Sequence, residues 1–390
     1  LLPTEKSVLN NEMKKTMIGG ALRRSAAALA CLAAGVLPAA AANEARPLEP
    51  GSEYLMVANY PNNLNVVDLA SESVYKTCPL PDAFGPGTTQ IAPDRRTAYI
   101  LNNRFGTIYG IDLDTCRLTF RAEMSQGDNE RAKSIASFTV SADGKEVYAV
   151  QNPTTIHRDH YRVGAPRFAV YDTRAGLEAK PVRVFPAPRQ ANIMQAGEDG
   201  SVYLAGPNLY KVDVNTGAMT VALPIRDWQR STHAPLDVLY IWPVQTPTRD
   251  FTILYTTAKY QDDKQDMATA EYQYGYLNVN LKSGETEARE FGPLTEIYFT
   301  GLRSPKDRNI VYGLLHRLTK YDIAQQKLVQ AAELDHTYYT VLSNQAGSRL
   351  YLTGTFNDIS IHDADTLAKV GQVKLPGGDM SLGTGQVFVR

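Results

Sequence analysis

The segment NVVDL, residues 65–69, is the first of seven similar stretches that recur along the chain. Each one reads as the end of a short apolar strand, then an acidic or amide residue, then a polar turn. This anchor residue is Asp68, Asp112, Asp172, Asp213, Asn280, Asp322 and Asp363 in turn. Successive anchors are separated by 44, 60, 41, 67, 42 and 41 residues. A base period with two enlarged gaps indicates repeated β units, two of which contain insertions.

Along the chain, a tight turn and then a further β-rich run precede most of the anchors. Turns such as Ser141-Ala142-Asp143-Gly144-Lys145 precede runs rich in Tyr, Val, Ile and Leu, as in hairpins. The strands predicted after these turns are Thr97–Leu101, Glu146–Val150, Ser201–Ala205, Asn309–Leu314 and Arg349–Thr353. Seven such units predict an all-β fold, a seven-bladed β-propeller of four-stranded antiparallel blades. The anchor side chains then have a structural role, accepting N–H bonds from the turn into the outer strand.

The two ends of this β region are expected to pair with each other. The run Glu53–Asn59 resembles the second strand of a blade, so this blade lacks its innermost strand. The segment Asp379–Val389 can supply it. Pairing the N- and C-terminal strands removes a free sheet edge and closes the ring.

The first 42 residues read as a short upstream segment, residues 1–12, followed by an export signal. Met13-Lys14-Lys15 and Arg23-Arg24 are basic, Ser25 to Leu37 is small and apolar, and Ala40-Ala41-Ala42 offers a cleavage site. We therefore expect translation to start at Met13, cleavage near Ala42, and residues 43–390 to form a single domain outside the cytoplasm. The formal net charge of -1 gives no electrostatic argument for nucleic-acid binding.

Two cysteines, Cys78 and Cys116, remain after the signal segment. An oxidising compartment favours a disulfide between them. The predicted strand arrangement opposes it, because it places the two residues at strand ends on opposite faces. The sequence leaves this pairing open.

Function is expected on one face of the ring. Loops between the second and third strands share that face with the blade-to-blade links, and nearly all long segments belong to these two groups. Long loops on a rigid scaffold commonly carry binding, and Arg, Tyr and Trp often anchor interfaces. The partner or substrate-pocket candidates are Tyr60, Asn62, Asn103, Arg104, Phe105, His157, Arg158, His160, Tyr161, Trp228, Tyr260, Tyr272, Tyr274, His316, Tyr338 and Phe356.

No complete catalytic motif is present in the sequence. His157-x-x-His160 with Asp159 is a weak metal pattern, and a polar interface loop explains it better. There is no C-x-x-C-H haem-attachment motif, no G-x-S-x-G and no P-loop. The remaining histidines are secondary candidates, because several could approach the central channel: His233, His316, His336 and His362. We expect no catalytic residue, metal or cofactor on this chain.

Two segments carry a resemblance to a known repeat. Tyr54-Leu55-Met56-Val57-Ala58-Asn59-Tyr60, followed by Asn63 to Asp68, resembles the YVTN-type propeller repeat, as does Ser141 to Tyr148. Across residues 43–390, the blade order, the two insertions and the signal segment resemble the β subunit of quinohemoprotein amine dehydrogenase.

This resemblance implies a periplasmic αβγ heterotrimer that oxidatively deaminates primary amines. It implies a γ subunit carrying cysteine tryptophylquinone and the catalytic base, and an α subunit carrying two c-type haems. The electron acceptor would be a soluble copper protein or a cytochrome. The β propeller would hold γ against α and help to wall the amine pocket. Two alternatives stay open, a standalone exported YVTN propeller that binds a surface ligand and a propeller lactonase.

Overall fold

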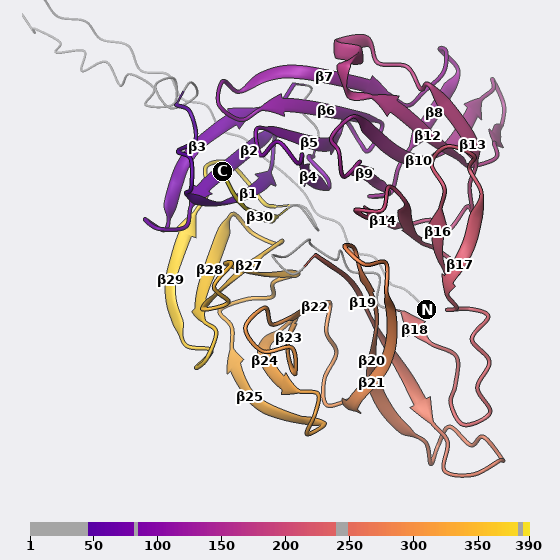
Figure 1. Cartoon of the computed structure of the whole chain (residues 1–390), viewed down its shortest axis with the longest axis vertical. Helices are drawn as coiled ribbons and strands as arrows, with labels where there is room; N and C mark the ends of the chain where they lie inside the picture. The colour runs from indigo at the N-terminus through magenta and orange to yellow at the C-terminus, as the bar shows by residue number, and fades with distance from the viewer. Residues whose placement is uncertain (1–45, 82–84, 239–248, 381–384) are drawn as a thin grey trace, which may run out of the picture. The chain divides into compact units, whose positions relative to one another are not determined.

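The computed structural model describes residues 46–81, 85–238, 249–380 and 385–390, which belong to one compact unit, Ala40–Arg390. These residues form seven antiparallel sheets arranged as the blades of a ring (Figure 1). The expected export signal with Met13 and its cleavage site near Ala42 lies outside the described residues. The predicted all-β fold of seven four-stranded blades is confirmed.

Blades 1 and 2 have the simple four-stranded pattern. Blade 1 consists of β3 (Ser73–Pro79), β2 (Asn63–Asp68), β1 (Glu53–Asn59) and β30 (Gln386–Val389). Blade 2 consists of β4 (Thr89–Ile91), β5 (Thr97–Asn102), β6 (Thr107–Asp112) and β7 (Arg117–Glu123).

Blade 3 has two additional strands. Its basic strands are β9 (Phe138–Val140), β10 (Glu146–Ile156), β12 (Arg167–Asp172) and β13 (Arg183–Pro186). The end of β10 also pairs with β8 (Glu130–Lys133) and β11 (Tyr161–Val163). The 3-10 helix η1 (Thr173–Glu178) follows β12. No helix among the described residues is long and apolar enough to cross a membrane.

The remaining four blades follow in chain order. Blade 4 consists of β14 (Ile193–Ala196), β15 (Val202–Ala205), β16 (Leu209–Val212) and β17 (Met219–Leu223). Blade 5 consists of β18 (Asp237–Val238), β19 (Asp250–Lys259), β20 (Glu271–Asn280) and β21 (Thr286–Pro293). Blade 6 consists of β22 (Thr300–Arg303), β23 (Ile310–Leu314), β24 (Arg317–Asp322) and β25 (Lys327–Glu333). Blade 7 consists of β26 (Thr340–Ser343), β27 (Arg349–Thr353), β28 (Asp358–Asp363) and β29 (Lys369–Lys374).

The anchor residues have the predicted structural role in all seven blades. Each anchor side chain accepts a hydrogen bond of 2.8–3.2 Å from the backbone N–H two residues later. The donors are Ala70, Asp114, Arg174, Asn215, Lys282, Ala324 and Asp365. This hydrogen bond satisfies a backbone N–H in the turn that has no partner in a neighbouring strand. The repeated anchors therefore stabilise turns and are not active-site acids.

The ring closes as the sequence predicts. Strand β30 pairs antiparallel with β1, and their register sets Tyr54 opposite Phe388 and Leu55 opposite Val387. The strand covers only four residues of the broader segment predicted for this role, of which residues 381–384 lie outside the described part. Blade 1 is thus built from both ends of the described chain (Figure 1).

Among the described residues, the core consists of seven apolar clusters, and each lies between two adjacent blades. In the cluster between blades 1 and 2, for example, Met56 and Val66 contact the group that includes Ile100 and Ile111. Side chains on both faces of a blade are therefore buried. This explains why the inner strands read as nearly continuous apolar runs.

A disulfide joins the outer parts of blades 1 and 2. The Cα atoms of Cys78 and Cys116 are 5.1 Å apart and their sulfur atoms are bonded. The expectation that these positions lie too far apart was wrong. Neighbouring strands rotate by about 20–25° relative to one another, and outer strands such as β7 and β29 therefore follow the edge of the ring (Figure 1). The end of one outer strand reaches the start of the next.

Lys76 is an unusual buried cation beside this disulfide. Its side chain is fully buried, and its Nζ donates to the backbone carbonyls of Arg46, at 2.8 Å, and Leu113. Burial lowers the pKa of Lys76 to about 8, although the nearby carboxylates of Asp114 and Asp112 oppose this shift. The folded protein therefore loses this proton at lower pH than the unfolded chain does.

This difference predicts a pH dependence of stability. Between pH 8 and 10.5 the unfolded chain keeps the Lys76 proton that the folded chain has released. The free energy of unfolding should therefore rise by about 1.4 kcal/mol per pH unit in this window and lose that gain as pH falls to 8. Urea unfolding at pH 7, 8, 9 and 10 gives the free energy of unfolding of the wild type and of Lys76→Met, and the difference between them isolates the contribution of Lys76. A difference that stays constant over this range would contradict the lowered pKa of Lys76.

Candidate functional site

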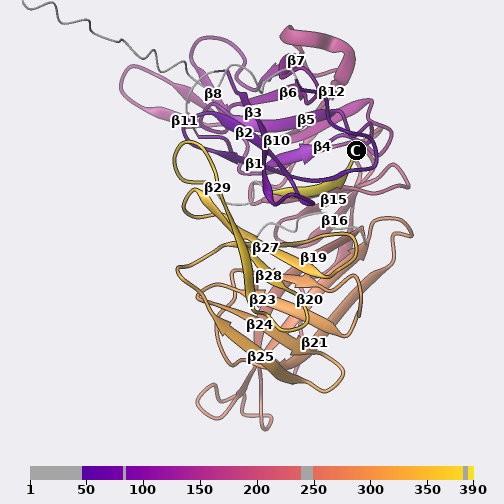
Figure 2. The ribbon, with the colours of Figure 1, turned by 90° about the vertical axis from the view of Figure 1, so that its left-hand side faces the viewer.

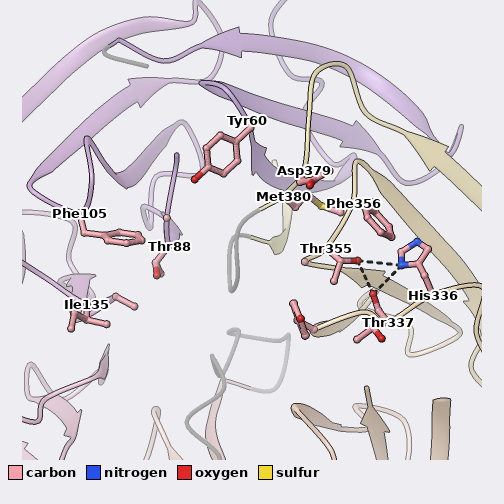
Figure 3. Close-up of a pocket in the computed structure, with 14 residues that line it drawn as sticks. Tyr60, Thr88, Phe105, Ile135, His336, Thr337, Thr355, Phe356, Asp379 and Met380 are labelled. Atoms are coloured by element: carbon pink, nitrogen blue, oxygen red, sulfur yellow. Dashed lines mark hydrogen bonds between the residues drawn. The ribbon is translucent and has the colours of Figure 1, made fainter. Parts of the chain in front are cut away.

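A large pocket opens on the face that the sequence analysis selects for function. Its volume is about 910 Å³. Its walls come from the second-to-third-strand loops of blades 1, 2 and 7 and from four blade-to-blade links (Figure 3). The lining residues are Tyr60, Gly87, Thr88, Phe105, Ile135, Ala136, His336, Thr337, Tyr339, Gly354, Thr355, Phe356, Asp379 and Met380.

Exposed apolar side chains concentrate at this pocket. Tyr60, Phe105 and Phe356 are 39%, 41% and 51% exposed, and Ile135 is 59% exposed. All four line the pocket. Exposed apolar side chains gathered around one pocket are typical of a surface that another molecule covers. Three of these residues, the aromatic ones, belong to the predicted candidate set.

The backbone that presents Phe105 is strained. Asn103, Arg104 and Phe105 have consecutive φ values of 50°, 53° and 65°. This left-handed region is uncommon for residues other than glycine, and such strain often occurs at functional sites. Asn103 Nδ2 donates to Thr107 Oγ1 at 3.1 Å, which helps to hold the loop.

Glycines allow the rings of Phe105 and Tyr60 to lie close to the backbone of the link between blades 1 and 2. A Cβ atom at Gly87 would lie 2.8 Å from the Phe105 ring, so a larger residue there would displace the ring from this position. A Cβ atom at Gly85 would lie 2.5 Å from the Tyr60 hydroxyl, and Gly85 also has a φ of 62°. These two glycines of the link between blades 1 and 2 therefore shape the pocket wall.

The link from blade 7 to blade 1 is tied to the Tyr60 loop through backbone hydrogen bonds. The N–H of Tyr60 donates to the carbonyl of Asp379 at 2.9 Å, and the N–H of Gly378 donates to the carbonyl of Tyr60 at 2.8 Å. On the other side, the N–H of Met380 donates to the carbonyl of Thr355 at 2.8 Å. Asp379 is therefore held between two blades, and Figure 3 shows Asp379 and Met380 between Tyr60 and Phe356.

His336 belongs to a hydrogen-bonded network at the blade 7 wall. Its Nε2 lies 3.1 Å and 3.2 Å from the two carboxylate oxygens of Asp358. Its Nδ1 lies 2.9 Å from the carbonyl of Thr337 and 3.2 Å from Thr355 Oγ1 (Figure 3). Asp358 is 3% exposed and also accepts a bond of 2.7 Å from the hydroxyl of Tyr338. Burial alone would raise the pKa of Asp358, but the bonds from Tyr338 and His336 outweigh it and keep that pKa below its usual value.

This network fixes the orientation of the His336 ring. Both ring nitrogens have hydrogen-bond partners within the wall, Asp358 at Nε2 and Thr337 with Thr355 at Nδ1. The ring packs between Tyr338 and Phe356, with centroid distances of 4.1 Å and 4.7 Å. We conclude that His336 fixes the position of Phe356 and of the wall around it.

The residues predicted in the first insertion lie on a hairpin away from the pocket. The structure forms β10 and β11 where the sequence predicts a long loop, and both strands extend blade 3 beyond the ring (Figure 2). His157 and His160 stack with their ring centroids 4.4 Å apart, and Tyr161 is 73% exposed. Arg158 is also exposed on this hairpin. Within the described residues, no group of three His, Cys, Asp or Glu side chains is placed to hold a metal ion.

The predicted residues on blade 5 are divided between surface and core. Tyr272 is 47% exposed on β20 and Tyr260 is partly exposed, but Tyr274 is only 1% exposed. Trp228 is partly buried, with the guanidinium of Arg230 4.2 Å from its ring centroid. The expectation that Tyr274 faces a partner is therefore wrong. The second insertion forms the strand ends of β19 and β20, and Tyr274 packs in the apolar cluster between blades 5 and 6.

The other predicted residues are not among those that line the pocket. Asn62 donates to the carbonyl of Leu80 at 2.8 Å, and His316 Nδ1 lies 2.9 Å from Thr337 Oγ1. Asn103 and Arg104 line a separate polar pocket. Tyr338 is only 1% exposed, so it does not form part of the partner-binding surface as predicted. Its hydroxyl donates to Asp358 and so supports the pocket wall.

Sequence reasoning missed two acidic residues of this site. Asp358 directly starts an anchor strand, and Asp379 lies in the closing link. His336 was noted only as one of several scattered histidines. The sequence could have indicated His336 and Asp379, because both lie in blade-to-blade links, and these links share one face with the long loops.

No protein-family model and no curated protein matches this sequence. Among solved structures, the chain is similar to dihydro-heme d1 dehydrogenase NirN in complex with DHE, with 15% identity and a TM-score of 0.49 over 84% of this chain and 65% of that chain. It is similar to Kuenenia stuttgartiensis hydrazine synthase, with 14% identity and a TM-score of 0.50 over 85% and 99% of the two chains. It is also similar to apo AztD from Citrobacter koseri, with 11% identity and a TM-score of 0.48 over 86% and 98%. At these identities the similarity concerns the propeller fold alone.

Proposed function

We propose that this chain is the noncatalytic β subunit of a periplasmic quinohemoprotein amine dehydrogenase, an oxidoreductase that deaminates primary amines. Its loop face binds a small γ subunit that carries cysteine tryptophylquinone and holds it against a dihaem α subunit. The chain itself binds no cofactor. Electrons leave the complex for a soluble copper protein or a cytochrome.

The pocket on the loop face is the observation that carries this proposal. Phe105, Phe356 and Ile135 present more than a third of their surface to solvent in one place. A partner that covers this face would bury these side chains and turn the open pocket into a closed, largely apolar cavity. Such a cavity excludes water from the reacting centre, which strengthens the electrostatic interactions of catalysis. In the family that the sequence resembles, the partner on this face is the quinone-bearing chain, which supports the choice of partner.

The composition of the complex tests this proposal. The native protein should be isolated under nondenaturing conditions and its associated chains identified by mass spectrometry, haem absorbance and quinone redox staining. We expect a dihaem chain and a small chain with a cross-linked quinone in constant ratio to this chain, together with amine-dependent dye reduction. A monomer without these partners would refute the proposal and favour a standalone YVTN propeller. Turnover of lactones by the chain alone would favour the lactonase alternative.

A further inference from the structure

The sheet that projects from blade 3 has one buried face and one exposed face. The end of β10 pairs with β8 on one side and with β11 on the other, and directly opposite residues point to the same face of a sheet. Ala132 and Pro153 are opposite each other, and both are buried. On the other face, Ile156 lies opposite Tyr161, and Val163 follows two residues later. Ile156, Tyr161 and Val163 are 37%, 73% and 62% exposed.

Hydrogen bonds hold this sheet in a fixed position. Glu130, on the buried face, forms an ion pair of 2.7 Å with Arg167, and its carboxylate also accepts a bond of 2.9 Å from the N–H of Gln126. The N–H of Ile156 donates to the carbonyl of Asn129 at 2.7 Å. The three apolar side chains are therefore exposed on an ordered surface. Single exposed apolar residues are common, but a group of them on one rigid face is typical of a contact surface.

The exposed face of this sheet is basic. Arg131 and Lys133 alternate with the buried Ala132 along β8, so both point to the face that carries Tyr161. Within the three described strands no acidic residue belongs to this face, because Glu130 points the other way. Arg131 and Lys133 also line the polar pocket between blades 2 and 3, whose volume is about 910 Å³. The charged residues that line this pocket are Arg104, Glu123, Asp128, Arg131, Lys133 and Lys180. Basic side chains therefore predominate from the sheet into the pocket.

These features favour a protein with an acidic surface over two other occupants. A second copy of this chain, facing the sheet across a two-fold axis, would bring the same cations close together. A membrane surface fits poorly, because the tip of the hairpin, residues 157–160, is polar and carries no apolar side chain that would enter the lipid first. A partner whose apolar patch is flanked by Asp or Glu would bury Tyr161 and Val163 and pair with Arg131 and Lys133.

We propose that this face of β8, β10 and β11 is the docking surface for a second protein partner, which presents an apolar patch edged with acidic residues. Its identification as the dihaem α subunit rests on the proposed function, whereas the apolar and acidic chemistry follows from the sheet. The sheet and the aromatic pocket are built from loops and links of the same face of the ring, so chains bound at the two sites can contact each other. Holding γ against α requires this arrangement.

Binding of the purified dihaem subunit to this chain, measured by biolayer interferometry, tests the inference. We expect Tyr161→Asp to weaken binding at least about thirtyfold, because it removes an aromatic anchor and places a carboxylate against an acidic surface. Lys133→Glu should slow association at low salt and make it less dependent on salt. The matched controls are Val182→Asp and Lys374→Glu, at exposed positions of blades 3 and 7, and both should bind like the wild type. All four variants should keep wild-type affinity for the γ subunit.

Each other outcome contradicts the inference. If Tyr161→Asp and Lys133→Glu bind the dihaem subunit as tightly as the controls, a different surface holds that subunit and only the inference fails. If the wild type does not bind the dihaem subunit, the proposed function fails and the inference fails with it. Sedimentation with vesicles of phosphatidylethanolamine and phosphatidylglycerol, and of the chain alone, tests the other two occupants. Vesicle binding or self-association that Tyr161→Asp abolishes would assign the face to that occupant instead.

Discussion

A chain that ends at Gly385 is expected to lose the cooperative unfolding transition of the propeller. The truncation removes β30, so β1 becomes a free edge and blade 1 keeps only three strands. It also removes Phe388, which is 2% exposed and packs against Tyr54 with a centroid distance of 5.9 Å. Loss of one buried Phe side chain costs about 3–5 kcal/mol, and domains are typically stable by only about 5–15 kcal/mol.

The closing strand also connects blades 1 and 2. Gln386 Oε1 accepts a hydrogen bond of 2.6 Å from the N–H of Ile91, and Arg390 forms an ion pair of 2.7 Å with Asp114. The truncation removes these contacts together with the strand. We therefore expect an effect larger than that of the single substitution Phe388→Ala.

Urea unfolding followed by circular dichroism measures this effect. We expect Phe388→Ala to lower the free energy of unfolding by about 3–5 kcal/mol and the truncated chain to show no sharp transition. Val370→Ala, at a position that is 48% exposed on β29, is the control and should change stability by less than about 0.5 kcal/mol. A truncated chain that unfolds at the wild-type midpoint would show that ring closure does not stabilise the fold.

The fold could be predicted because its information is local and repeated. Each anchor side chain bonds to a turn N–H two residues away, so the same chemistry recurs in seven blades regardless of the insertions. The extended hairpin of blade 3 was missed because its residues have no buried face. Residues 156–163 are all exposed, and the alternation in Tyr161-Arg162-Val163 covers only three residues, which is too short to mark β11 as a strand.

The pocket could be predicted only in part, because it depends on contacts between blades. Tyr60, Phe105 and Phe356 were identified, since strand alternation places their loops on one face. The pairing of His336 with Asp358 joins a link to a strand 22 residues away, and no local pattern signals it. Tyr274 was assigned to the surface because the strand register that buries it is set by tertiary pairing, which sequence alone does not define.

The double substitution Phe105→Asp and Phe356→Asp is expected to abolish binding of the quinone-bearing partner. Both rings are more than 40% exposed in this chain, so folding depends little on them. Asp is among the residues that tolerate the left-handed backbone at position 105, which has a φ of 65°. Aromatic anchors at interface centres often contribute at least about 2 kcal/mol each, so their joint loss should weaken binding by about a thousandfold.

The affinity of the purified chain for the γ subunit, measured by biolayer interferometry, tests this expectation. Val221→Asp changes a side chain that is 53% exposed on the outer strand β17 and is the matched control. It should bind the partner with wild-type affinity, and the thermal midpoints of all variants should agree within a few degrees. If the double variant binds as tightly as the control, the partner contacts another face and the aromatic pocket is not its docking site. Because this readout is binding and not turnover, it reports on docking alone.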